Sequence, residues 1–160
     1  MLDSYRIELS KTRLEKARRE HQTAVINRDT GFFDAANNRA YYTIFHAIRA
    51  VLALDGVDFK THSRVIGYFN SKYFNTDLID RSLSEIVKRT SKSRTGSDYE
   101  DFYVATQEEV EKNIAGAEKL LVAVERYLVE RLDAEHNSSE EYDSGYEAED
   151  DEENDLDPEL

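Results

Sequence analysis

One arginine and one histidine have the types and the spacing to act together on a phosphate group. Arg39 and His46 are seven residues apart, in a segment from Phe32 to Leu54 that contains neither proline nor glycine. Seven residues make nearly two turns of an α-helix, so both side chains would lie on one face, with Thr43 between them. An imidazole can move a proton at a ribose hydroxyl or a leaving oxygen, and a guanidinium can stabilise charge on the phosphorane. The pair therefore suits cleavage of RNA without a metal ion.

The two sides of this helix differ in the size of their residues. Alanines flank the arginine and the histidine on one side, at positions 35, 50 and 53, whereas bulky side chains occupy the other side, at Tyr41, Ile44, Phe45, Ile48 and Leu52. Two interpretations of the alanine side remain open. It packs on another helix of the same bundle, with His46 as a buried core residue, or it meets its own copy in a twofold dimer, which places two Arg–His pairs around one cleft.

Further candidates lie in the middle of the chain. His62 stands beside an expected helix start, where the helix dipole favours a phosphate; alternatively Thr61 or Ser63 caps the helix and His62 lies on its surface. Arg94 and Tyr99 follow a basic run and could bind phosphates along one rim, although such a run is more often merely solvated. Four tyrosines could stack on bases, or could instead belong to the core, namely Tyr41, Tyr42, Tyr99 and Tyr103.

Several other chemistries are excluded by composition and spacing. The chain has no cysteine, which removes disulfide scaffolds, thiol catalysis and cysteine-based zinc sites. No glycine-rich phosphate loop, metalloprotease helix or nucleophilic triad is found, and His21 and His136 complete no histidine metal site. We therefore expect neither a metal site nor a cofactor.

The elements that position these residues are expected to be long helices. Apolar periodicity predicts helices over about 3–27 and 32–54, the second ending at Gly56, then a shorter helix from Thr61 through Phe74. Thr76 or Asp77 should cap a fourth helix, a polar basic loop is expected over 90–97, and Thr106 to Glu109 reads as a capping box for a long final helix. The sequence predicts an all-α fold, an antiparallel bundle of four main helices with a short accessory helix.

The charge of the chain is distributed unevenly. The formal net charge is −13, yet residues 1–133 hold all 21 basic residues and 21 of the 34 acidic ones, so this part is neutral. The other 13 acids lie in 134–160, which we expect to be a disordered acidic tail following one domain at 1–133. The N-terminus lacks the features of a signal peptide and no apolar run is long enough to span a bilayer, so a cytoplasmic protein without a membrane association is expected.

Several short segments resemble a known family when they are taken together in order. They are Asn-Arg-Ala-Tyr-Tyr at 38–42, Phe-His-Ala at 45–47, Lys-Thr-His-Ser at 60–63 with Val65, Ile66 and Phe69, Arg94 with Asp98 and Tyr99, and Thr-Gln-Glu-Glu at 106–109. This set resembles the HEPN superfamily, and most of all its small stand-alone prokaryotic branch. The resemblance covers about residues 32–127.

The resemblance implies a dimeric helical domain that is often a ribonuclease toxin with an Arg-x4–6-His motif. Such domains are frequently encoded beside a small nucleotidyltransferase that silences them. Arg39 and His46 match the motif at the upper limit of its spacing and would be catalytic, and the residues that would bind substrate are Asn38, Tyr42, His62, Arg94 and Tyr99.

This chain also departs from the pattern of many toxin members. In those proteins a polar residue directly follows the arginine and the motif lies later in the domain, whereas here Ala40 follows Arg39 and no histidine follows Arg94 at motif spacing. Two alternatives to a ribonuclease therefore stay open. One is a non-catalytic HEPN module that binds nucleotide or a partner nucleotidyltransferase, and the other is a structural dimerisation domain.

Overall fold

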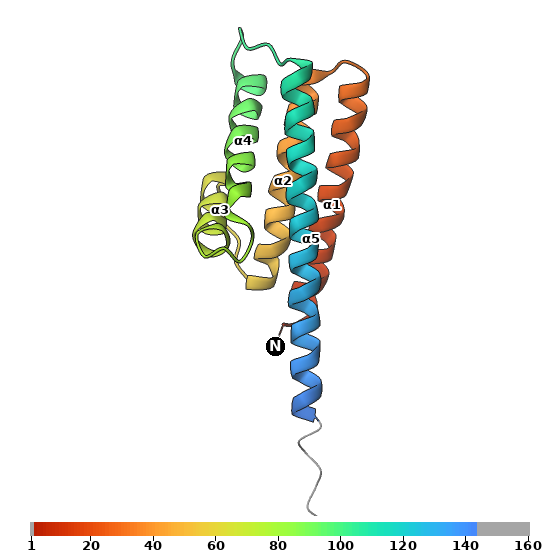
Figure 1. The fold of residues 1–160 in the computed structure, drawn as a ribbon, viewed down its shortest axis with the longest axis vertical. Helices are drawn as coiled ribbons and strands as arrows, with labels where there is room; N and C mark the ends of the chain where they lie inside the picture. Colours follow the sequence, from red (N-terminus) through yellow and green to blue (C-terminus); the bar gives the residue numbers. More distant parts are fainter. Residues whose placement is uncertain (1, 144–160) are drawn as a thin grey trace, which may run out of the picture.

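Four long helices run side by side and alternate in direction along the chain, in a computed structural model that describes residues 2–143 (Figure 1). A short fifth helix lies against one side of this bundle, which confirms the predicted architecture. The helices are α1 (Ser4–Asp29), α2 (Phe33–Asp55), α3 (His62–Phe69), α4 (Ser84–Tyr99) and α5 (Gln107–Asp143). Within residues 2–143, no helix is both long enough and apolar enough to cross a membrane.

Local capping signals fix most of the helix boundaries. Gly56 ends α2 in the left-handed conformation, with φ of 68°, which only glycine adopts without strain. The hydroxyl of Thr61 accepts a hydrogen bond from the amide of Arg64 at the start of α3, and Thr106 accepts one from the amide of Glu109 at the start of α5. All three signals were predicted from the sequence and are confirmed.

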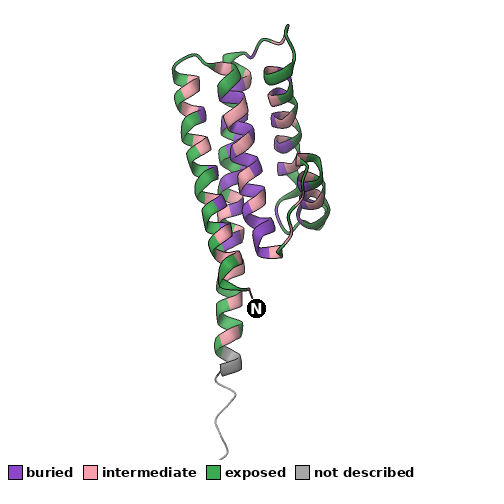
Figure 2. Ribbon diagram, turned by 180° about the vertical axis from the view of Figure 1, so that it is seen from behind, coloured by how far each residue is buried: buried purple, intermediate pink, exposed green. Residues whose placement is uncertain are grey.

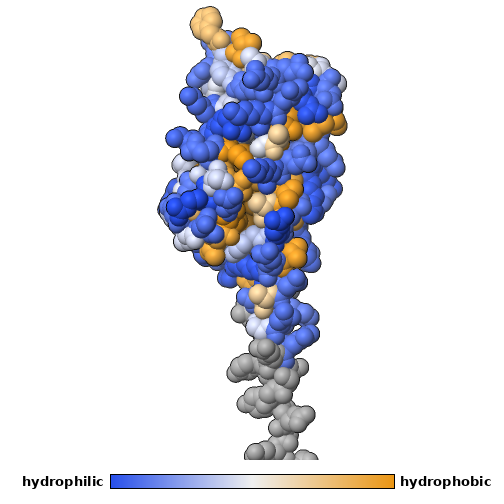
Figure 3. Space-filling model, in the orientation of Figure 1, coloured by the Kyte–Doolittle hydropathy of each residue, from blue (hydrophilic) through white to orange (hydrophobic). Residues whose placement is uncertain are grey.

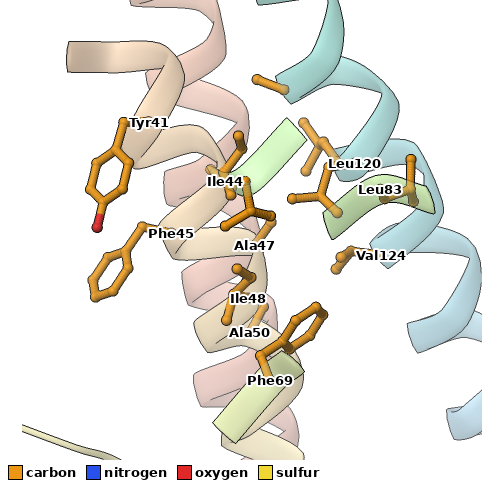
Figure 4. Packing of buried hydrophobic residues seen from close by; sticks show 14 of the residues in the cluster. Tyr41, Ile44, Phe45, Ala47, Ile48, Ala50, Phe69, Leu83, Leu120 and Val124 are labelled. Carbon is orange, nitrogen blue, oxygen red and sulfur yellow. The ribbon is translucent and has the colours of Figure 1, made fainter. Parts of the chain in front are cut away.

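Helix α2 is the centre of the bundle. It packs on α1, α4 and α5, and Figure 2 shows it as the most thoroughly buried of the long helices. Ile44, Ala47 and Ile48 point from α2 toward Leu120 and Val124 of α5, whereas Tyr41 and Phe45 project to another side of the helix (Figure 4). A helix enclosed on nearly all sides can expose few positions, and those few matter for the site described below.

The prediction of a polar loop over 90–97 is wrong, because α4 continues without a break to Tyr99. Thr90, Ser93 and Gly96 recur at a spacing of three and are buried on the packed face of α4. Their partners come from other elements: Ser93 donates a hydrogen bond to Glu109, and a Cβ on Gly96 would lie only 2.6 Å from the ring of Tyr103. Over this part of α4, small residues and not large apolar ones form the packed face, so the sequence shows no apolar periodicity that would predict a helix.

The segment between α3 and α4 also differs from the prediction. The third helix does not run as one α-helix to Phe74, because residues Asn70–Phe74 form a π-helical turn. The fourth helix does not begin at Thr76 or Asp77: Asp77 has a φ of 58°, and Asp80 caps a 3-10 turn, Arg81–Leu83, that leads into Ser84. The left-handed backbone at Asp77 stops a helix from starting there.

Two polar side chains have environments that the sequence did not predict. Arg13 on α1 is buried and donates hydrogen bonds to the carbonyl of Arg49 and to Asp58. Glu109 was expected to complete the capping box, yet its carboxylate instead accepts hydrogen bonds from Ser93 and Tyr103. Both residues link distant segments rather than neighbouring turns.

The final helix extends further than expected. The tail was expected to begin at residue 134, but α5 continues through Asp143 and projects beyond the end of the bundle (Figure 1). The Nε2 of His136 lies 3.1 Å from a carboxylate oxygen of Glu140 one turn later, and a helix that is already formed gains one hydrogen bond for each residue added. The rest of the expected tail, 144–160, lies outside the described residues.

Candidate functional site

Helix α2 has one uncovered strip, and every residue on it is polar. Between Ala36 and Leu54, all residues are buried except five, which lie along one side of the helix: Asn38, Arg39, Tyr42, His46 and Arg49. We call these five residues the polar strip. Helix α1 flanks one edge of the strip, and α3 and α4 flank the other. Both predicted catalytic residues lie on it.

The alanine side of α2 is covered by α1 of the same chain. Thr43, Ala50 and Ala53 are buried, and the hydroxyl of Ser10 on α1 donates a 2.7 Å hydrogen bond to the carbonyl of Ala50. The first of the two interpretations of this side is therefore correct for Thr43, Ala50 and Ala53, whereas Ala35 is exposed. Arg39 and His46 lie beside the α1–α2 contact and stay partly exposed, so His46 is not fully buried in the core.

Arg39 is held by an acid that the sequence analysis did not single out. Its guanidinium Nη1 donates to both carboxylate oxygens of Glu20 on α1, at 3.2 and 3.0 Å. The Arg39 side chain is 43% exposed and the Glu20 side chain 21%, so the pair lies at the surface with the acid on its inner side. A phosphate that approaches Arg39 must compete with Glu20.

His46 lies in a mixed environment. Burial lowers its pKa, the charge of Glu20 opposes that effect, and the charges of Lys16, Arg49 and Arg13 lower the pKa further. Its Nδ1 is buried and makes no hydrogen bond within the described part of the chain. The result is an imidazole that is neutral at pH 7 and has hydrogen-bonding capacity to spare.

His62 is brought to the strip although it comes from α3. Its Nδ1 lies 2.9 Å from the hydroxyl of Tyr41, and its ring stacks on Phe45 with the centroids 4.0 Å apart. Burial lowers the pKa of His62, and the charges of Arg94 and Arg49 add to the effect. Thr61 does cap the helix as the alternative proposed, but His62 packs against α2 and is not a free surface residue.

Arg94 closes the site from α4. Its guanidinium lies over the ring of Tyr41 at 4.9 Å and over the rings of Tyr42 and Tyr99 at 5.6 and 5.7 Å, and it donates to the Tyr42 hydroxyl at 3.3 Å. Asp98 forms an ion pair with Arg94 at 3.1 Å. The Nε–H of Arg94 is not aligned for a hydrogen bond to that carboxylate, which leaves this donor buried without a partner among the described residues.

The structure therefore brings the predicted substrate-binding residues together. Asn38 donates to Asp98 at 2.9 Å, Tyr42 accepts from Arg94, and the Tyr42 ring lies 5.9 Å from those of His46 and His62. Tyr99 is 71% exposed and joins the group through Arg94. Arg39 stands at the α1 edge of the strip, separated from Arg94 by the width of α2.

Sequence reasoning missed three residues of this site. Glu20 holds Arg39, Phe45 supports His62, and Asp58 accepts hydrogen bonds from Arg49 and Arg13 at the other end of the strip. Each of these contacts joins two elements, so no spacing within one helix could reveal it. Among residues 2–143, no group of three or more His, Cys, Asp or Glu side chains is arranged to hold a metal ion.

An apolar tip adjoins the site at the loop between α4 and α5. Phe102 is 99% exposed and Val104 is 78% exposed, close in sequence to Tyr99. Figure 3 shows hydrophobic atoms at this end of the molecule, above a surface that is mostly hydrophilic. Exposed aromatic side chains thus extend the site toward one end of the bundle.

Comparisons with known proteins agree with this fold and place it in a family. A family model described as the HEPN domain matches residues 10–127. A UPF0332 protein of Thermotoga maritima is 33% identical over 98 residues, which is 61% of this chain and 74% of that protein. A Methanocaldococcus jannaschii protein named "Putative toxin MJ0142" is 27% identical over 127 residues, or 79% of this chain and 86% of that protein.

Solved structures show the same fold at low sequence identity. The crystal structure of TT1696 from Thermus thermophilus superposes with a TM-score of 0.64 and 22% identity, covering 74% of this chain and 97% of that one. ST0689, described as an archaeal HEPN homologue, gives a TM-score of 0.58 with 17% identity and covers 72% of this chain and 94% of that one. These likenesses concern the fold of the helical bundle.

Proposed function

Because the chain belongs to the HEPN domain family, we propose that it is a metal-independent endoribonuclease that acts as a homodimer in the cytoplasm. Its biological role would be that of the toxin of a toxin–antitoxin or defence system, silenced by a nucleotidyltransferase-type antitoxin. Relatives that carry the word toxin in their names support this role.

The polar strip is the observation that carries the proposal. A helix that is buried nearly all round leaves five polar residues uncovered, among them Arg39 and His46. Burying this strip under the chain's own apolar helices would be costly, because its charged and polar groups would lose water without gaining partners. An arginine and a neutral imidazole on the one open side of a rigid helix are instead well placed to meet a phosphodiester.

In this proposal each predicted residue has a defined task. His46 acts as a general acid or base, and Arg39 binds the phosphate and stabilises the charge that develops in the transition state. The remaining residues bind the RNA chain by stacking, hydrogen bonding and charge, namely Asn38, Tyr42, His62, Arg94 and Tyr99. RNA is the substrate because the mechanism needs a 2′-hydroxyl as its internal nucleophile.

The proposed dimer uses the surface of α2 that α1 does not cover. Ala50 and Ala53 are already covered within one chain, whereas the polar strip is partly exposed, so we place the contact with a second copy at the strip. A twofold axis near the strip would bring two Arg39 and His46 pairs into one cleft. Such a cleft would also exclude water from the reacting phosphate, which strengthens every charge interaction inside it.

One observation favours the alternative of a non-catalytic module. Arg39 is already paired with Glu20, and Arg94 with Asp98, so both positive charges have a carboxylate beside them without RNA. A strip with neutralised arginines could serve to bind a nucleotide or a partner nucleotidyltransferase. A purified protein that binds such a partner but leaves every tested RNA intact would support this reading instead.

The direct test compares the natural protein with His46→Asn and with a matched control, His136→Asn. His136 is exposed on the last part of α5, far from the strip. In buffer with a strong chelator, we expect the natural protein and the control to cleave single-stranded RNA. His46→Asn should lose about 10²–10⁴-fold in rate, with an unchanged helical signal and melting temperature. Equal cleavage by all three proteins, or by none, would refute the proposal.

A further inference from the structure

We infer that the cleavage centre of each subunit contains a second proton-transfer residue, His62, which works as a pair with His46 of the same subunit. This inference rests on the proposed function and goes beyond it, because it changes His62 from a binding residue into an acid–base residue. Arg94 supplies a second cation, which binds the RNA backbone at the His62 side of the strip, while Arg39 keeps its proposed task at the α1 side. The site would then resemble a two-imidazole reaction centre built within one chain.

The rings of the two histidines belong to one cluster. The centroid of Tyr42 lies 5.9 Å from that of His46 and 5.9 Å from that of His62, and Phe45 lies 6.0 Å from His46 and 4.0 Å from His62. The two imidazoles therefore flank the same two rings, and in our inference a phosphodiester lies across Tyr42 between them. His46 comes from α2 and His62 from the first turn of α3, so the fold, not the local sequence, creates the pair.

Tyr41 fixes the orientation of His62. The Tyr41 hydroxyl contacts Nδ1 at 2.9 Å, and burial raises the pKa of Tyr41 to about 12, so this group keeps its proton. A hydroxyl can either donate to a neutral Nδ1 or accept from a protonated one. Tyr41 therefore occupies Nδ1 in both protonation states of the imidazole and leaves Nε2 for the substrate.

Arg94 is the cation nearest to His62 and Tyr42. Its guanidinium donates to the Tyr42 hydroxyl, and its Nε–H is buried without a hydrogen-bond partner among the described residues. This Nε lies 3.1 Å from Oδ2 of Asp98 in an ion pair, but without an aligned hydrogen bond the buried donor is only partly satisfied. A phosphate oxygen is the acceptor that suits it best, and it would replace the poorly aligned contact with Asp98.

The charges around the pair keep both imidazoles neutral when no phosphate is bound. His62 faces Tyr41 and Arg49 on α2 and Arg94 on α4, and its pKa is lowered by burial and by the two arginines. For His46, burial lowers the pKa, Glu20 on α1 opposes it, and Lys16, Arg49 and Arg13 add to the lowering. An arriving phosphate brings negative charge, which favours protonation of one imidazole of the pair.

The reaction balances with two imidazoles and RNA alone. One neutral imidazole takes the proton of the 2′-hydroxyl as the 2′-oxygen forms a bond to phosphorus. The protonated imidazole donates its proton to the 5′-oxygen as the bond from phosphorus to that oxygen breaks. The products are a 2′,3′-cyclic phosphate and a 5′-hydroxyl, and the two histidines have exchanged protonation states, which water restores.

The first experiment compares His62→Asn with His46→Asn and with the surface control His136→Asn. The asparagine amide keeps a polar atom near the Tyr41 hydroxyl, so the fold of α3 should be retained. We expect both His62→Asn and His46→Asn to lose about 10²–10⁴-fold in the cleavage rate of RNA. If His46→Asn loses this activity but His62→Asn stays within about threefold of the natural protein, the inference fails while the proposed function stands.

A substrate with a good leaving group separates proton donation from binding. A uridine 3′-nitrophenyl phosphate needs no protonation of its leaving oxygen, so the variant that lacks the acid should regain nearly the natural rate on it, while the variant that lacks the base should not. We expect one of the two histidine variants to be rescued. If neither is rescued and both lose equally on the two substrates, His62 only binds or positions RNA and the inference is wrong.

Mixing the two variants tests whether the pair belongs to one subunit. In an equal mixture of His46→Asn and His62→Asn, each subunit lacks one imidazole, so no site within a subunit is intact. We expect no activity above that of the separate variants. A pair formed across the dimer would instead give one intact site in each mixed dimer, or about a quarter of the natural activity, and that result would overturn the assignment.

Discussion

Replacing Glu20 with glutamine should make the protein bind RNA more tightly. In the structure, the Glu20 carboxylate accepts two hydrogen bonds from Arg39, at 3.2 and 3.0 Å. If Arg39 meets a phosphate, as proposed, it must first leave this carboxylate, and RNA must approach its negative charge. Glutamine has nearly the same shape but no charge, so it removes both costs without opening a cavity.

The size of the effect follows from the exposure of the pair. Partly exposed ion pairs contribute about 0.2–1 kcal/mol. The Glu20 side chain is only 21% exposed and both of its oxygens are engaged, so the upper end of that range applies, although the 43% exposure of Arg39 limits it. About 1 kcal/mol corresponds to roughly a fivefold decrease in Kd for RNA.

The assay is fluorescence anisotropy of a labelled single-stranded RNA, with the His46→Asn change in every protein to prevent cleavage. The matched control is Glu15→Gln, because Glu15 pairs with Arg18 and Arg19 on the outer side of α1, away from the strip. Glu20→Gln should bind about fivefold more tightly at low salt, and its advantage should fade near 1 M salt, where the Debye length is about 3 Å. Unchanged or weaker binding would show that Arg39 does not contact the RNA.

Two further predictions concern stability and the acidic end of the chain. The side chain of Asp55 is buried, and its carboxylate accepts hydrogen bonds from Tyr73, Lys72 and Arg131; burial alone would raise its pKa, but these hydrogen bonds together lower it. Asp55→Asn should therefore lower the free energy of unfolding, measured with urea at pH 7, by about 2–3 kcal/mol. This loss is somewhat smaller than that expected on breaking a fully buried ion pair, because Lys72 and Arg131 are partly exposed. The difference in unfolding free energy between the two proteins should shrink as the pH falls below about 4 and through the lowered folded-state pKa of Asp55, because only the charged carboxylate stabilises the fold. A difference that stays constant with pH would exclude the charge as its cause. Deleting 134–160, which holds 13 acids and no basic residue, should strengthen RNA binding at low salt in the same anisotropy assay, and unchanged affinity would assign this segment a solubilising role.

The helices could be predicted from the sequence where their signals are local. Gly56, Thr61 and Thr106 act on backbone groups within four residues of themselves, so the type of residue and its place in the pattern were sufficient. Helix α4 was missed over 90–97 because its packed face is made of small polar residues. The hydrogen bond from Asn37 to Ser97 shows why this face is stable in a core: its partner comes from α2, 60 residues earlier in the chain.

The site was predictable in part for the same reason. Helical periodicity places Arg39 and His46 on one side of α2, and the structure confirms that they share a strip. Periodicity does not fix how far α1 is shifted along α2, and that register decides whether Glu20 or a neighbouring residue meets Arg39. The contact between His62 and Tyr41 depends likewise on the path of the chain between α2 and α3.

The ion pairs of the strip explain how a polar site can persist on the central helix of a bundle. Each arginine around the strip is held by a carboxylate from another element or another turn, the pairs being Arg39 with Glu20, Arg49 with Asp58 and Arg94 with Asp98. These carboxylates keep the cations compatible with packing when no ligand is present, and a phosphodiester can replace them one at a time. The affinity for RNA is then set by competition between phosphates and the chain's own acids. Removing one of those acids should therefore strengthen binding, whereas removing an arginine should weaken binding and also release the carboxylate that it neutralised.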